Sequence, residues 1–314
     1  MNKSDPKSDS VPLVDPSVYD LVTEAVRAAA KQALETGTVA AVIGYAAGRR
    51  DGTALPVIIG DPAETSRLIF SPACVNNLSF YLTKAKKEVS GRGKLAIIAK
   101  GCDMRALVGL MSESQLTRGD VFIIGVACPG VLRSGAGCRV LTGESIADKC
   151  RECTVHLPEG ADVQAGTLPP LPKLDPVESE ELARLEAMTP AERWDFWKQH
   201  FSRCVRCLAC RQVCPFCYCE QCLCDRNRPQ AVESTPRPGG NMAWHLVRAI
   251  HLAGRCGGCA ECERVCPMDI PLNLLNRKMA KELKELYDFE AGLEAREKGP
   301  LTSYDDKDDQ SFIK

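Results

Sequence analysis

The sequence has little net charge and few histidines. Lysine and arginine number 40 and aspartate and glutamate 41, for a formal net charge of −1. This balance disfavours a nucleic-acid-binding surface, where a basic excess is expected. The four histidines, His156, His200, His245 and His251, form no triad-like or metal-binding pattern. Because no nucleophile–base pair is recognisable either, we expect them to be structural or surface residues.

Long apolar runs are also missing. Residues 1–14 are polar, resemble a loose tail and lack the apolar core of a secretory signal. No stretch reaches the length of a membrane span, and the longest apolar runs, 39–45 and 121–127, suit buried strands. Cysteine, in contrast, is abundant, with 18 residues in 314. Without a secretory signal this count indicates metal binding in a reducing compartment, so we expect a cytoplasmic protein.

The first half of the chain alternates strand and helix patterns. Branched apolar runs predict buried strands at 39–45, 94–99 and 121–126, and Pro56 places a further strand, 55–59, at an edge. Helices are predicted from Asp15 to Gly37, over 75–87 and over 103–115. Strand, helix, strand at this spacing indicates βαβ connections. We therefore predict an α/β domain over residues 15–153 with a mostly parallel sheet.

The second half has a different composition. Residues 154–178 are rich in Pro and Gly and are predicted to be a linker. Ser179 is a candidate helix cap, Thr189 and Glu192 form a capping box, and Asn241 is a candidate cap for 242–253. A last helix is expected over 272–286. We predict a helical domain over 179–290 and a tail over 291–314.

Two copies of one cysteine motif dominate the helical half. The run Cys204-x-x-Cys207-x-x-Cys210-x-x-x-Cys214-Pro215 recurs as Cys256-x-x-Cys259-x-x-Cys262-x-x-x-Cys266-Pro267. This spacing is typical of paired [4Fe–4S] clusters, in which the fourth cysteine of each motif ligates the other cluster. An isolated CxxC pair would equally suit zinc, but two matching four-cysteine copies favour iron–sulfur. The predicted ligands are Cys204, Cys207, Cys210 and Cys266 for cluster 1, and Cys256, Cys259, Cys262 and Cys214 for cluster 2.

A crowded cysteine segment lies between the motifs. Cys217, Cys219, Cys222 and Cys224 occupy eight residues, and as a C-x-C-x-x-C-x-C set they could hold an extra metal, either zinc or a further cluster. The alternative is free thiols beside the clusters, some of them serving as substitute ligands.

The α/β half contains a third candidate site. Cys102 and Cys128 follow two predicted parallel strands, so both are expected at the carboxyl edge of the sheet, where open α/β folds bind ligands. Cys150 and Cys153 complete a four-thiolate set for a third [4Fe–4S] cluster. The alternative is that Cys102 and Cys128 simply pack in the core. Cys74 is the expected substitute ligand, and Cys138 is unassigned.

The motifs carry family resemblances. The helical two-motif region resembles the α-helical ferredoxin domain found in the iron–sulfur subunits of heterodisulfide reductases and succinate dehydrogenases, with the small α+β ferredoxin fold as the alternative. Residues 100–105 (Lys-Gly-Cys-Asp-Met-Arg), 123–130 (Ile-Ile-Gly-Val-Ala-Cys-Pro-Gly) and 149–153 (Lys-Cys-Arg-Glu-Cys) resemble the beta-subunit family of deazaflavin-reducing hydrogenases and formate dehydrogenases. The resemblance covers roughly residues 70–290.

The resemblance implies an electron-transfer subunit of a multisubunit anaerobic oxidoreductase, such as a formate dehydrogenase, a hydrogenase or a heterodisulfide-reductase-like complex. Its partners would be other redox subunits, and its cofactors two or three [4Fe–4S] clusters. One alternative is a flavin-containing reductase subunit that exchanges hydride with a deazaflavin or NAD(P)H. Another, suggested by the cysteines alone, is a zinc-binding interaction module.

The sequence departs from what a flavin site would require. No G-x-G-x-x-G opens a helix, and Asp15-Pro16-Ser17-Val18 replaces the Gly-rich entry expected in the family for flavin phosphate. FAD is therefore the less favoured cofactor. Four basic residues could contact an anionic cofactor, or could simply face solvent: Lys84, Lys86, Lys100 and Arg105. Asp103 and Arg105 are expected instead to support the Cys102 loop by hydrogen bonding and pairing.

Overall fold

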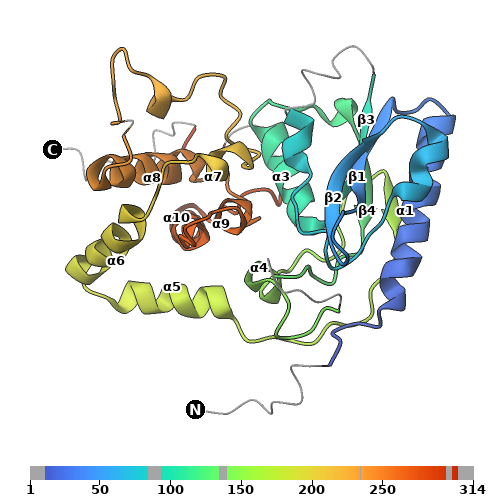
Figure 1. The fold of residues 1–314 in the computed structure, drawn as a ribbon, viewed down its shortest axis with the longest axis horizontal. Coiled ribbons are helices and arrows are strands. Elements are labelled where there is room, and N and C mark those ends of the chain that lie inside the picture. The colour runs from blue at the N-terminus through green and yellow to red at the C-terminus, as the bar shows by residue number, and fades with distance from the viewer. Residues whose placement is uncertain (1–10, 84–92, 134–139, 234, 295–298, 303–314) are drawn as a thin grey trace.

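The computed structural model describes residues 11–83, 93–133, 140–233, 235–294 and 299–302. An N-terminal α/β part packs against a C-terminal helical part (Figure 1). Among the described residues, no helix is both long and apolar enough to cross a membrane.

The α/β part is built on one five-stranded sheet in the order β2-β1-β3-β4-β5. β1 pairs parallel with β3, β3 with β4 and β4 with β5, whereas β2 pairs antiparallel with β1 at the edge, as the position of Pro56 predicted. The strands are β1 (Ala41–Ala47), β2 (Ala54–Ile59), β3 (Leu95–Ala99), β4 (Val121–Val126) and β5 (Val163–Ala165). The predicted α/β class with a mostly parallel sheet is confirmed.

Helices cover both sides of this sheet. α1 (Ser17–Glu35) and α3 (Gly101–Ser112) lie on opposite sides (Figure 1). α1 buries Val22, Val26 and Ala30, which recur every four residues and so form one apolar stripe. Shorter helices connect the layers: 3-10 helices at Pro62–Arg67 and Arg118–Asp120, and α4 (Asp148–Arg151).

The helical part contains longer helices around two short ones. α7 (Ala209–Gln212) and α9 (Glu261–Arg264), each inside one cysteine motif, contact each other. Thr189 and Glu192 form the predicted capping box at the start of α6. The remaining elements are α5 (Val177–Ala187), α6 (Pro190–Ser202), a 3-10 helix (Leu223–Asp225), α8 (Pro238–Leu252) and α10 (Leu272–Tyr287).

The predicted linker, residues 154–178, is partly a strand of the sheet. β5 pairs with β4, and the Asp162 carboxylate before it accepts a hydrogen bond from the Ile123 amide at 2.7 Å. Pro and Gly exclude a helix here but leave room for three paired residues, so composition alone misplaced the boundary. α5 then starts at Val177. Ser179 is not its cap, because its amide and hydroxyl bind the Glu152 carboxylate.

The predicted tails are shorter than composition suggested. Val14 is buried, and the Leu13 amide donates to the Leu141 carbonyl at 2.9 Å. Near the other end, the Ala291 carbonyl accepts a hydrogen bond from the Arg105 guanidinium at 2.9 Å. Residues 11–14 and 291–294 therefore belong to the fold; residues 1–10, 295–298 and 303–314 lie outside the described residues.

Two predicted helix starts also shift. The helix expected from residue 75 begins at Ser79, whose amide donates to the Asn77 side chain at 3.1 Å. The rest of that helix, with Lys84 and Lys86, lies outside the described residues. α8 begins at Pro238, three residues before Asn241, so Asn241 is an interior residue and not a cap.

Candidate metal centres

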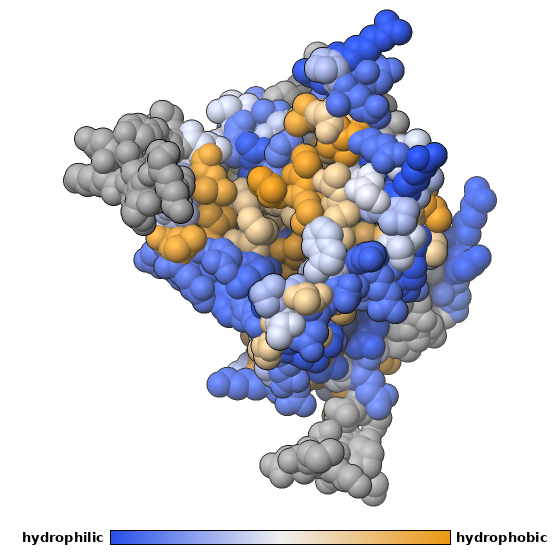
Figure 2. All heavy atoms as spheres, turned by 90° about the vertical axis from the view of Figure 1, so that its left-hand side faces the viewer, coloured by the Kyte–Doolittle hydropathy of each residue, from blue (hydrophilic) through white to orange (hydrophobic). Residues whose placement is uncertain are grey.

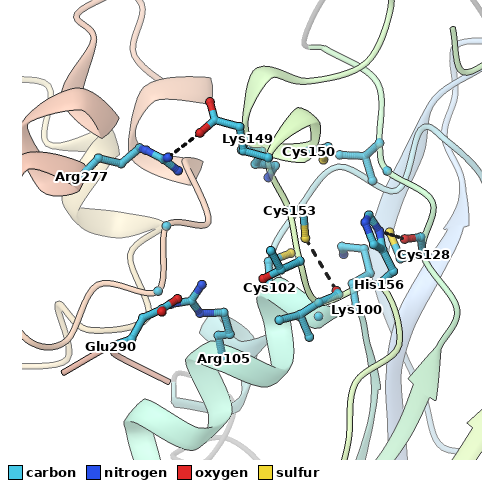
Figure 3. Close-up of a pocket in the computed structure, with 18 residues that line it drawn as sticks. Lys100, Cys102, Arg105, Cys128, Lys149, Cys150, Cys153, His156, Arg277 and Glu290 are labelled. Carbon is cyan, nitrogen blue, oxygen red and sulfur yellow. Dashed lines mark hydrogen bonds and ion pairs between the residues drawn. The ribbon is translucent and has the colours of Figure 1, made fainter. Parts of the chain in front are cut away.

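The cysteines of the α/β part meet at the carboxyl edge of the sheet. Four of them line one cavity of about 210 Å³ (Figure 3). They come from the first turn of α3, from the end of β4, from α4 and from the loop after it: Cys102, Cys128, Cys150 and Cys153, here called the sheet-edge set. The structure thus brings together the third cysteine group expected from the sequence.

Close backbone contacts shape this cavity. A Cβ atom on Gly101 would lie 1.8 Å from the carbonyl oxygen of Val155, so only glycine permits α3 to start beside that loop. The Cys128 amide donates to the His156 carbonyl at 2.8 Å, and the His156 ring lies 3.0 Å from the Cys128 carbonyl oxygen. These contacts fix the loop that carries Cys153 against the end of β4.

A network of buried polar side chains lies beside the cavity, at the start of α3. Lys100 is only 1% exposed, and its Nζ lies 2.9 Å from Asp103 Oδ2 and donates to the Asn76 carbonyl at 2.8 Å and to the Tyr45 hydroxyl. Asp103 also accepts the backbone amides of Lys100 and Leu78. Asp103 therefore supports the Cys102 loop, as expected. Lys100 is not the solvated surface lysine that the sequence suggested.

Burial controls the ionisation of these thiols. It raises the pKa of Cys102 to about 11 and also raises the pKa of Cys128, Cys150 and Cys153. Burial would lower the pKa of Lys149, but the neighbouring Cys102 and Glu261 raise it overall. A bound metal centre would have to displace the thiol protons, and the charged Lys149 would stabilise the resulting negative charge.

The helical part closes the same cavity. Gly257 and Gly258, between Cys256 and Cys259, belong to its lining. Lys149 Nζ donates to the Cys259 carbonyl at 2.7 Å and lies 3.9 Å from the Glu261 carboxylate. Further contacts across the junction are Arg277 with Glu152 at 2.9 Å and Arg105 with Glu290 at 3.1 Å (Figure 3). The sheet-edge set is thereby held next to the second cysteine motif.

The two cysteine motifs share one backbone form. Two residues after the first cysteine, Arg206 and Gly258 have positive φ; four residues after it, Leu208 and Ala260 do as well. A four-residue helix follows in both, α7 and α9. The Arg206 amide donates to the Cys204 sulfur at 3.4 Å, and the Gly258 amide likewise to Cys256. Three non-glycine residues in the left-handed region cost of order 1–3 kcal/mol each, so these loops are held for a reason other than stability.

The first ferredoxin-type set surrounds an apolar cavity. Its neighbours include Met268, Ile270 and Trp244, and the set itself comprises Cys204, Cys207, Cys210 and Cys266. The first three come from one motif and the fourth from the other, which is the crossed arrangement expected from the spacing. Asn241, fully buried, holds the loop: its Nδ2 donates to the carbonyls of Phe201 (3.1 Å) and Cys204 (2.8 Å).

The second ferredoxin-type set comprises Cys214, Cys256, Cys259 and Cys262. Burial raises the pKa of the last three thiols, and Cys214 raises it further in each, which places Cys214 beside them. Asn276 Nδ2 lies 3.7 Å from the Cys262 sulfur. A hydrogen bond from Cys217 lowers the pKa of Cys214 to about 6.

One arginine lies between the two ferredoxin-type sets. Arg248 is 7% exposed, and its Nη2 donates to the Cys210 carbonyl at 3.2 Å. Burial would lower the pKa of Arg248, but the nearby thiolates of Cys214, Cys262 and Cys217 raise it overall. A buried cation here stabilises negative charge on either side.

The remaining cysteines separate into two groups. Cys74, expected as a substitute ligand, is fully buried in the core, where the Ser71 amide donates to its sulfur, and it is not part of the cavity lining. Cys138 lies outside the described residues. Cys217, Cys219, Cys222 and Cys224 all line a further cavity.

The donor chemistry suits iron–sulfur clusters. A cubane cluster needs thiolates spaced around an inorganic core. The sheet-edge set and the first ferredoxin-type set each line one cavity with four thiols, so both fit this cofactor in donor type and number.

Three residues that build these sites were not identified from the sequence. Asn241 was assigned to a helix cap, while Lys149 and Arg248 were given no role. For Lys149 the sequence does contain a clue, because this residue directly precedes Cys150 in the motif that resembles the family. For Arg248 the sequence contains no clue, because its position depends on the packing of α8 against both motifs.

Proteins with similar sequences are found among the beta subunits of F420-dependent formate dehydrogenases. The beta subunit of the F420-dependent formate dehydrogenase of Methanocaldococcus jannaschii is 30% identical over 98 residues, 31% of this chain and 25% of that protein. The beta subunit of F420-dependent formate dehydrogenase 1 of Methanococcus maripaludis is 21% identical over an alignment of 356 residues, covering 86% of this chain and 90% of that protein. The chain is related to these beta subunits. The predicted resemblance to the beta subunits of deazaflavin-dependent formate dehydrogenases is confirmed.

The extent of the likeness differs between relatives. The chain spans about a quarter of the first relative's length and nine-tenths of the second's. A chain of the F420-reducing [NiFe] hydrogenase complex of Methanosarcina barkeri is 20% identical, with a TM-score of 0.30 over 37% of this chain and 43% of that one, too low to define a shared fold. No family model matches the sequence.

Proposed function

We propose that the chain is an iron–sulfur electron-transfer subunit of a multisubunit oxidoreductase, of the kind represented by F420-dependent formate dehydrogenases and F420-reducing hydrogenases. The observation that carries this is the succession of three four-cysteine sets. The sheet-edge set adjoins the Cys256–Cys259 loop, and Cys214 joins that loop to the first motif. When bound, [4Fe–4S] clusters would accept and release single electrons.

The protein's own residues support this role in three ways. In both motifs the same positions have left-handed backbone conformations, which orient the thiols in the same way. Buried Lys149 and Arg248 stabilise negative charge beside the sets. Apolar residues such as Met268 and Ile270 line the cavity of the first ferredoxin-type set and limit its contact with water.

The first ferredoxin-type set lies closest to a surface suited to a redox partner. Cys207 is exposed, as are Val205 beside it and Leu246 and Ile250 on α8. Figure 2 shows apolar side chains gathered on the side that carries α6 and α8 in Figure 1. Exposed apolar side chains on this side of the molecule suit docking of another redox subunit. The sheet-edge set lies at the opposite end of the series.

The deciding experiment is metal and cofactor analysis of the full chain isolated without oxygen. Iron, acid-labile sulfide, zinc and flavin are measured per chain, with electron paramagnetic resonance of the reduced protein. Three clusters give about twelve iron and twelve sulfide. Zinc in place of iron would reject the proposal. Stoichiometric flavin would instead favour the reductase alternative.

A further inference from the structure

We propose that Cys217, Cys219, Cys222 and Cys224 form a fourth iron–sulfur site, next to the second ferredoxin-type set. All four line one cavity of about 60 Å³. Its opposite wall is one face of α8 and the turn after it: Trp244, Arg248, His251, Leu252 and Arg255. These residues recur at helical spacing, so the cysteine segment lies along a single helix face.

Packing orients the start of this segment. Phe216 is buried against α3, where a Cβ atom on Gly109 would lie 2.8 Å from its ring. The Tyr218 hydroxyl donates to the Glu113 carboxylate at 3.0 Å. Aromatic residues that contact α3 thus alternate with Cys217 and Cys219, which line the cavity. The α/β part therefore holds these two thiols toward α8.

The end of the segment is fixed independently. The Asp225 amide donates to the Cys222 carbonyl at 2.9 Å, and the Asp225 carboxylate pairs with Arg211. Cys224 is buried, while Cys222 is partly exposed, and their two thiols are hydrogen-bonded to each other. Both ends of the eight-residue segment are therefore positioned by contacts outside it.

The charge around the cavity favours an anionic occupant. Arg211 and Arg255 have carboxylate partners, Asp225 and Glu113. Arg248 is different: its hydrogen bonds go to the Cys210 carbonyl and to the thiols of Cys214 and Cys217, and among the described residues its buried Nε has no hydrogen-bond partner. A buried guanidinium that is not fully satisfied is costly. A cluster bound by four thiolates carries the negative charge that would offset it.

Two observations favour a cluster over a single zinc ion. An all-thiolate donor set suits either. Zinc, however, draws its four sulfurs to about 2.3 Å around one point, whereas these cysteines are spread along one wall of a cavity whose opposite wall is α8. The Cys217 thiol is also hydrogen-bonded to Cys214 of the second ferredoxin-type set, so the site adjoins the proposed electron path.

The test compares the full chain, isolated without oxygen, with a Cys219→Ser/Cys222→Ser variant. Gln221→Ser, in the same segment, is the matched control. We expect the double variant to lose about four iron and four sulfide per chain, and the control to lose none. An unchanged iron content, or loss of about one zinc, would overturn the inference. If the wild-type chain and the double variant both contain about twelve iron atoms, the inference fails but the proposed function is unaffected. If both contain little iron, the proposed function is rejected as well.

A second measurement needs no variant. Cys219 is exposed, so a free thiol there would react with iodoacetamide. We expect Cys219 in the iron-loaded protein to be protected, and to be modified after the iron is removed by a chelator, as read by mass spectrometry. Modification of Cys219 in the iron-loaded protein would overturn the inference even if the double variant failed to fold.

Discussion

Lys149 Nζ donates a hydrogen bond to the backbone oxygen of Cys259 at 2.7 Å. Lys149 belongs to the α/β part, where it directly precedes Cys150 of the sheet-edge set, and Cys259 belongs to the second ferredoxin-type set in the helical part. The lysine therefore does two things: it fixes the junction between the two parts, and it places a buried positive charge between the two candidate cluster sites.

Replacing Lys149 by Met tests the effect of its charge on the neighbouring clusters. Loss of the buried charge disfavours the reduced, more negative state of a neighbouring cluster. We expect its midpoint potential to fall by about 60 mV, equivalent to about 1.4 kcal/mol for a one-electron couple. Redox titration followed by electron paramagnetic resonance measures the shift. Lys173→Met, at an exposed position, is the control. Equal potentials in both variants would contradict the role given to Lys149.

Cys214→Ser tests the crossed ligand arrangement. Cys214 interacts electrostatically with Cys256, Cys259 and Cys262, and it does not line the cavity of the first set. We expect loss of about four iron and of the signal of that cluster, while the cluster of Cys204, Cys207 and Cys210 persists. Cys74→Ala, which removes a core thiol, should leave iron unchanged. Loss of the first cluster's signal instead would show that each motif binds its own.

Asn241→Leu tests the support of the first ferredoxin-type set. Asn241 satisfies the buried carbonyls of Phe201 and Cys204 and accepts a hydrogen bond from Arg206. Leaving the two carbonyls without donors should lower the free energy of unfolding by about 3 kcal/mol. It should also reduce iron retention at this set. Urea unfolding of the metal-free chain and iron analysis measure both, with exposed Asn227→Leu as control. A variant as stable as the control would refute the assignment.

Glu186 provides a pH-dependent contact between α5 and α10. Hydrogen bonds from Lys278 and Lys281 lower its pKa from 4.5 to about 2. Because the folded-state pKa is depressed, the contact stabilises the fold above pH 4.5 and is lost as the pH falls toward 2. The melting temperature of Glu186→Gln should therefore lie below wild type at neutral pH and approach it in acid. The contact is at the surface, so about 1 M salt should also shrink the difference. The contact would play no such role if the difference in melting temperature did not change with pH and salt, or if Glu180→Gln showed the same difference.

Local signals in the sequence predicted several features well. Apolar runs of branched residues located β3 and β4, and Pro56 marked the edge strand, because strand propensity and the missing proline N–H act locally. The capping box at Thr189 and Glu192 is likewise a contact within four residues. Cysteine spacing pointed to the first ferredoxin-type set, and the ends of two strands pointed to the sheet-edge set; each of these sets lines a cavity.

Features that depend on distant contacts were missed. β5 gains its strand conformation from β4, not from its own Pro- and Gly-rich surroundings. Asn241 looks like a cap in sequence, yet its partners lie 37 and 40 residues away. Lys100 resembles a surface lysine in sequence, but in the fold it is buried together with its partners Asp103 and Tyr45.

The sequence by itself determined which thiols have the spacing for iron–sulfur ligands and which segments form the sheet, since both follow from short-range chain geometry. Only the tertiary structure decided where the remaining cysteines lie and which charged residue lies beside them. It placed Cys74 in the core, gathered Cys217, Cys219, Cys222 and Cys224 along α8, and inserted Arg248 among them. The physical reason is that a ligand site needs side chains from several elements to converge, and that convergence is set by packing between helices and sheet rather than by any local pattern.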